Sequence, residues 1–136
     1  MQKTIIAFVF SLFSIFALAQ KQQASYQLSS HILDVSKGMP ANEVTIKLEK
    51  YDTMSKTWHY VAEKITDKNG RVPDFLAGDD NRGIYKLTYF TSDYFKKNKT
   101  ETFYPFIEVV FEITDSTHYH VPITLSAFGY STYRGN

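Results

Sequence analysis

The sequence predicts a small all-β protein, a two-sheet antiparallel sandwich of about eight strands with one short helix. Most segments outside the loops alternate apolar and polar residues with a period of two, which is typical of half-buried strands. Aromatic residues, which favour strands, make up 16% of the chain. The strands are short and separated by turns, and no strand-helix-strand spacing indicates a parallel sheet. At 136 residues the chain has room for one hydrophobic core.

The first half of the mature chain predicts three strands. They span residues 28–34, 44–51 and 57–65. The second strand is the clearest, because Val44, Ile46 and Leu48 alternate with polar residues and form an apolar face. Residues 38–42, rich in turn formers, are expected to form a loop between the first two strands.

The second half predicts the remaining strands and the helix. The strands span residues 84–90, 106–113, 119–125 and 130–134. Asn69-Gly70 predicts a tight turn, because Gly adopts positive φ at little cost, and a loop is expected at 76–83. A short helix is expected at 93–97, with Thr91 or Ser92 as its N-cap and basic residues at its C-terminal end.

The N-terminal segment has the features of a secretory signal peptide. Lys3 precedes an apolar run from Ile5 to Leu18, and Ala17-Leu18-Ala19 supplies a cleavage site. The run has 14 residues, whereas a membrane-spanning helix needs about 20. We therefore expect residues 1–19 to be removed and residues 20–136 to form one domain. We also expect export across the inner membrane, a periplasmic location and no membrane attachment of the mature chain.

Charge and cysteine content exclude several classes of partner. The chain has 15 Lys and Arg against 14 Asp and Glu, for a formal net charge of +1. The longest basic cluster, 96–99, lies beside acidic residues and is interpreted as a solvated helix end, so we expect no nucleic-acid ligand. With no Cys in the chain, neither a disulfide nor a thiol-linked lipid is possible.

Histidines lie on the faces of predicted strands that point away from the core. In the strand that ends at Leu125, His118 and His120 share the face opposite the apolar residues, ahead of Pro122. In the first strand His31 lies on the non-core face, and in the last strand Tyr133 does so too. By themselves these residues are equally well interpreted as ordinary polar side chains on a solvated surface, and they do not assemble one site.

Successive motifs along the whole mature chain resemble the 5-hydroxyisourate hydrolases, the enzyme branch of the transthyretin-related family. These are Leu28-Ser29-Ser30-His31-Ile32-Leu33-Asp34, Gly38-Met39-Pro40-Ala41, Asn69-Gly70-Arg71, His118-Tyr119-His120-Val121-Pro122 and Tyr130-Ser131-Thr132-Tyr133-Arg134-Gly135. The Tyr-Arg-Gly ending is the most specific. Segments 83–86 and 108–111 resemble the family at large, hormone carriers included. The chain departs from the enzyme branch at Asn136, where Ser is usual, and at Ala127, where Pro is common.

The resemblance implies a transthyretin-like sandwich that assembles as a homotetramer, a dimer of dimers. It implies hydrolysis of 5-hydroxyisourate to 2-oxo-4-hydroxy-4-carboxy-5-ureidoimidazoline in urate degradation, without a cofactor or metal. The implied catalytic residues are His31, Arg71 and His120, and the implied substrate-binding residues are His31, Arg71 and Tyr133. The alternation of side chains across each predicted strand agrees with this assignment, since His31, His120 and Tyr133 all lie on non-core faces.

Opening a lactam requires an activated water, stabilisation of a tetrahedral oxygen and a proton for the departing nitrogen. A neutral His can accept the water proton, and a nearby Arg disfavours protonation of that His. Our hypothesis makes His120 the base and His31 the proton donor, although the two roles could be exchanged. Arg71 would bind the carbonyl oxygen as negative charge develops on it.

Two other interpretations remain open. Alternating His118 and His120, together with His31, could bind zinc. A transthyretin-like sandwich could also serve as a non-enzymatic small-molecule carrier or binding module. Trp58 and His59 are interpreted as structural or solvent-facing. A hydrolysis assay on fresh substrate distinguishes an enzyme from a carrier, and a chelator tests for the metal.

Overall fold

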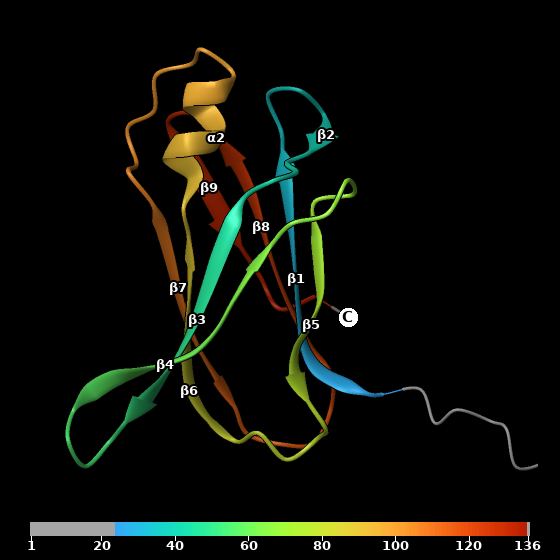
Figure 1. The fold of residues 1–136 in the computed structure, drawn as a ribbon, viewed down its shortest axis with the longest axis vertical. Helices are drawn as coiled ribbons and strands as arrows, with labels where there is room; N and C mark the ends of the chain where they lie inside the picture. The colour runs from blue at the N-terminus through green and yellow to red at the C-terminus, as the bar shows by residue number, and fades with distance from the viewer. Residues whose placement is uncertain (1–23, 136) are drawn as a thin grey trace, which may run out of the picture.

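The computed structural model describes residues 24–135, which form two β-sheets packed face to face with one helix at one end (Figure 1). The expected signal segment lies outside the described residues, as does Asn136. The elements are β1 (Tyr26–Asp34), β2 (Met39–Pro40), β3 (Thr45–Asp52), β4 (Thr57–Ile65), β5 (Arg71–Ala77), β6 (Gly83–Tyr89), α2 (Thr91–Lys97), β7 (Ile107–Ile113), β8 (Tyr119–Ser126) and β9 (Gly129–Thr132). The predicted fold class, a two-sheet sandwich with a single short helix, is confirmed for this part of the chain.

The sheet that carries the site has the order β2-β1-β8-β9, with β5 also paired to β1. The other sheet has the order β4-β3-β6-β7. All pairs are antiparallel except β1 and β8, which run parallel. Alternation within a strand shows which face is buried but not which strand is its partner or in which direction that partner runs. β1 and β8 are far apart in the sequence and are not joined by a hairpin, which would have made them antiparallel.

The core lies between the sheets and contains the apolar faces that the sequence predicts. Leu28 and Ile32 of β1 and Ile123 of β8 are fully buried, as are Ile46 and Leu48 of β3. Burial of each such side chain contributes roughly 1.5–3 kcal/mol to folding. Since successive side chains point to opposite faces, this burial directs the alternate residues of β1 and β8 outward.

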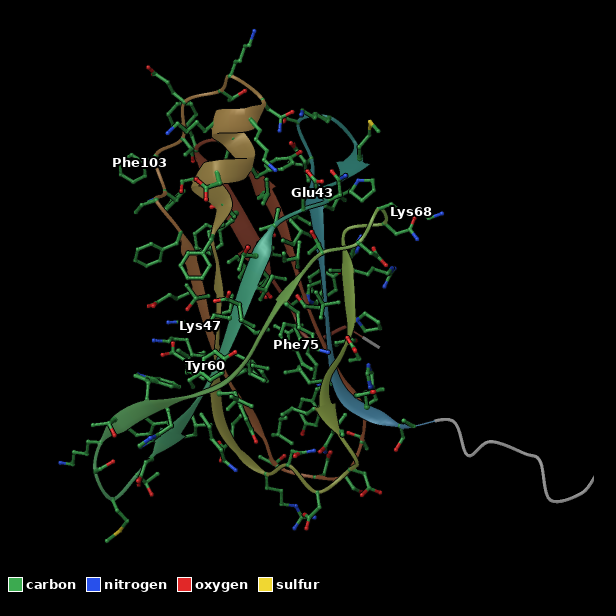
Figure 2. The ribbon with its side chains drawn as sticks, in the orientation of Figure 1. Glu43, Lys47, Tyr60, Lys68, Phe75 and Phe103 are labelled. Atoms are coloured by element: carbon green, nitrogen blue, oxygen red, sulfur yellow. The ribbon has the colours of Figure 1, made fainter. Side chains whose placement is uncertain are left out.

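The sequence predicts no strand for β5: it places a tight turn at Asn69-Gly70 and a loop at 76–83, and it assigns no element to the residues between them. Pro73 cannot donate to the ladder and the residues do not alternate, so the sequence carries no strand signal there. The structure pairs β5 with β1 through two register irregularities. Phe75, labelled in Figure 2, joins the core from this strand. The consequence for function is that Arg71, directly after the tight turn, is the first residue of a sheet strand.

Gly70 fixes the start of β5. Its φ is +69°, and a Cβ added there would lie 2.6 Å from the carbonyl oxygen of Ile32. The Ile32 amide in turn donates to the Gly70 carbonyl over 2.9 Å. Only glycine combines this backbone conformation with so close an approach to β1, so the Asn-Gly turn sets where Arg71 enters the sheet.

Smaller differences concern element ends. Residues 38–42 include the two-residue strand β2, and the last strand ends at Thr132, two residues earlier than predicted. The prediction of Thr91 or Ser92 as helix cap is wrong: the helix begins at Thr91, and Phe90 stands at the N-cap without a side-chain hydrogen bond. The basic residues do occupy the last turn. Residues 24–135 contain no helix long and apolar enough to cross a bilayer.

Candidate active site

Three neighbouring strands bring the predicted catalytic residues to one face of a sheet. In the antiparallel pair of β1 and β5, His31 lies directly opposite Arg71, and in the parallel pair of β1 and β8, Ser29 lies opposite His120. Side chains at such positions are close neighbours when they point to the same face. The two histidines are half-buried and Arg71 is exposed.

These side chains line one hollow of about 410 Å³. Its lining residues are Ser29, His31, Arg71, His118, His120, Tyr133 and Gly135. The structure therefore brings together all four residues that the sequence interpretation selected. Tyr133, 60% exposed, also borders a second hollow. The sequence does not assign three lining residues, Ser29, His118 and Gly135, to the site, although apolar-polar alternation puts Ser29 on the same face as His31 and His118 on the same face as His120.

The pKa values of His31 and His120 are both lowered in the hollow. Partial burial is the largest cause that lowers the pKa of His120 below 6.5, followed by repulsion from the Arg71 charge and from the protonated forms of His31 and His118. Burial also leads for His31, followed by Arg71. At His31, however, a hydrogen bond with the Asn69 backbone and the Asp67 carboxylate raise the pKa and so partly offset the decrease.

Ser29 connects His120 of β8 to His118, the residue that immediately precedes β8. Its Oγ lies 2.8 Å from Nε2 of His118 and 2.8 Å from Nδ1 of His120. The other ring nitrogen of His118, Nδ1, lies 2.9 Å from the carbonyl oxygen of Tyr26. Among the described residues, none hydrogen-bonds to Nε2 of His120, which leaves that nitrogen available to a molecule in the hollow.

The C-terminal segment packs against His120. The Gly135 amide donates to the His120 carbonyl over 2.8 Å. A Cβ on Gly135 would lie 2.5 Å from Cδ2 of the His120 ring, so no larger residue fits without displacing the imidazole. The Arg134 guanidinium lies 4.3 Å above the Tyr119 ring and donates to the Thr117 hydroxyl. These contacts give a physical reason for Arg134 and Gly135 of the Tyr-Arg-Gly ending.

The zinc interpretation meets a geometric difficulty. In the part of the chain that the structure describes, no three His, Cys, Asp or Glu side chains are grouped so that they could hold a metal ion. Both nitrogens of His118 are engaged in hydrogen bonds, so a metal would have to replace one of them. His59 is exposed near Thr57 and Asp52, as expected for a solvent-facing residue.

Comparison with known proteins connects this site to one family. A family model described as the HIUase/Transthyretin family matches residues 28–135. A probable 5-hydroxyisourate hydrolase of Caenorhabditis elegans is 42% identical over 137 residues, which cover 93% of this chain and 98% of the relative. The structure of Klebsiella pneumoniae 5-hydroxyisourate hydrolase matches with a TM-score of 0.70 and 35% identity, covering 80% of this chain and 98% of that one. Sea bream transthyretin in complex with thyroxine matches with a TM-score of 0.75 and 28% identity, covering 80% of this chain and 94% of that one.

Proposed function

The chain belongs to the HIUase/Transthyretin family, and on that premise we propose that it hydrolyses 5-hydroxyisourate. The product would be 2-oxo-4-hydroxy-4-carboxy-5-ureidoimidazoline, in the degradation of urate. The observation that carries the proposal is the convergence of His31, Arg71 and His120 on one hollow. Two imidazoles and a guanidinium supply the acid, base and oxyanion-stabilising groups that lactam hydrolysis requires.

The environment of His120 supports its role as general base. Its pKa is lowered by burial and by neighbouring positive charges, so at neutral pH the ring is mainly neutral. Nε2 can then accept a proton from water as the water oxygen bonds to the substrate carbonyl carbon.

The environment of His31 supports its role as proton donor. Burial and then Arg71 lower the pKa of His31 as well, but Asn69 and Asp67 favour its charged form, and no corresponding contribution acts on His120. Two titratable groups whose surroundings differ in this way are suited to opposite roles. His31 would protonate the ring nitrogen as the carbon–nitrogen bond breaks. Arg71, its cross-strand neighbour, would bind the carbonyl oxygen while that oxygen carries negative charge.

The decisive experiment mixes the purified protein with freshly made uricase product and follows the decay of 5-hydroxyisourate absorbance. We expect decay well above the spontaneous rate, unchanged after treatment with a strong chelator. Binding of the compound without accelerated decay would favour the carrier alternative. Chelator inactivation that zinc reverses would restore the metal interpretation.

We further propose that the mature protein is an exported homotetramer. Large aromatic side chains lie exposed on the single chain, among them Tyr60 and Phe103 at 67% and 72% (Figure 2), and such residues are typical of surfaces that assemble. Full-length protein expressed with its leader and recovered from the periplasm should begin at Gln20 and sediment as a tetramer. A retained leader would contradict the export proposal, and a fully active monomer would contradict the assembly.

A further inference from the structure

A chain of three hydrogen bonds runs along the non-core face behind His120. It joins the Tyr26 carbonyl to Nδ1 of His118 over 2.9 Å, Nε2 of His118 to Oγ of Ser29 over 2.8 Å, and Oγ of Ser29 to Nδ1 of His120 over 2.8 Å. The parallel register of β1 and β8 places Ser29 beside His120, and the period of two places His118 on the same face.

The donor and acceptor of each of these three hydrogen bonds can be assigned, because the Tyr26 carbonyl at one end can only accept. A carbonyl oxygen only accepts, so Nδ1 of His118 must carry the proton that it donates to Tyr26. Nε2 of neutral His118 is then unprotonated and accepts from the Ser29 hydroxyl. The Ser29 oxygen, having used its proton, can only accept from Nδ1–H of His120. In neutral His120 the remaining nitrogen, Nε2, therefore has a free lone pair.

We propose that Ser29 and His118 are positioning residues that hold His120 in the Nδ1–H tautomer, with unprotonated Nε2 facing the hollow. This inference rests on the proposed function, because it assigns the device to the general base of that reaction. Neither residue needs to touch substrate. Their effect is that neutral His120 is present in the tautomer that can accept a proton from water.

Loss of either partner has a distinct consequence. Without the Ser29 hydroxyl, His120 is free to place its proton on Nε2, and that fraction cannot act as base. Without His118, the Ser29 hydroxyl can rotate and donate to Nδ1 of His120, which favours the unproductive tautomer. Since both changes interrupt one chain, their effects should not add.

The direct test is ¹⁵N NMR of the imidazole nitrogens in the substrate-free protein. Neutral His120 should be protonated at Nδ1 in the unmodified protein and partly at Nε2 in Ser29→Ala. Ser55→Ala is a matched control, because it also removes a serine hydroxyl from a series of hydrogen bonds that ends at a histidine. The Ser55 hydroxyl bonds to the Thr57 hydroxyl, which bonds to His59 of the other sheet. The control should leave the His120 signals unchanged. An Nε2–H tautomer in the unmodified protein, or no change in Ser29→Ala, would overturn the proposal.

Kinetics supply the second test. We expect Ser29→Ala to lower kcat about 10- to 100-fold, the usual effect of removing an orienting partner, with little change in KM. Ser29→Thr, which keeps the hydroxyl, should recover most of kcat. Ser29→Ala combined with His118→Ala should be no slower than the slower single variant. Additive losses of kcat in the double variant would contradict the proposal that Ser29 and His118 act through one series of hydrogen bonds. A folded Ser29→Thr variant that does not recover kcat would contradict it too. The NMR result stands apart from turnover, so an inactive protein with the expected tautomers would refute the proposed function alone.

Discussion

Replacing His120 with Ala should lower kcat for 5-hydroxyisourate hydrolysis by about 10²- to 10⁴-fold, the usual contribution of a general acid or base. The imidazole is half-buried and lines the hollow, and among the described residues none hydrogen-bonds to its Nε2, so the variant loses the group that we propose as the base. Substrate binding should weaken less than turnover, because proton transfer stabilises the transition state more than the ground state. Single-turnover measurements separate the two effects.

His59→Ala is the matched control for this change. His59 is exposed in the other sheet, so its removal should leave the rate unchanged. Circular dichroism checks that His120→Ala keeps the fold. We expect it to do so, because the core lies between the two sheets and the His120 ring lies on the opposite face of its sheet. Turnover within a few fold of the unmodified protein would remove His120 from the mechanism and leave His31 as the candidate base.

The sequence predicts those strands in which apolar and polar residues alternate, because that pattern lies within the strand itself and does not depend on its partner. Alternation in β1, β3 and β8 identifies their buried faces, and from these follows the outward direction of His31 and His120. Strand β5 could not be recognised, because Pro73 interrupts it and it depends on pairing with β1. Its position in the sheet, and so the pairing of Arg71 with His31, is a tertiary property.

The candidate site divides in the same way. Residue types and family resemblance select His31, Arg71, His120 and Tyr133, but they do not reveal what supports these side chains. The hydrogen bonds of Ser29 join positions 89 and 91 residues apart, through a parallel strand pair that the alternation does not predict. The packing of Gly135 on the His120 ring likewise becomes apparent only when β8 and the chain end are placed side by side.

Arg71→Gln is expected to have two separable effects with one cause. The first is a loss of about 10²- to 10³-fold in kcat, the usual result of removing one donor to a developing oxyanion. The second is a rise of the pKa of His120 and of His31 toward 6.5, because the guanidinium charge that opposes a second positive charge is gone. In this variant the pKa of His120 would still be lowered by burial and by His31 and His118. The pKa of His31 would still be lowered by burial and raised by Asp67 and Asn69.

Titration of the ring proton signals by NMR measures the second effect without substrate. Arg82→Gln removes an exposed guanidinium from the loop before β6 and should leave both pKa values unchanged. The sign also predicts the rate profile: the pKa of a base falls when a cation is near, so the acid limb of kcat/KM should lie below pH 6.5 and move upward in Arg71→Gln. Unchanged histidine pKa values in that variant would mean that Arg71 does not act on the imidazoles electrostatically. In the proposed mechanism one guanidinium would both keep the base neutral and bind the oxyanion, which a neutral donor opposite His31 would not do.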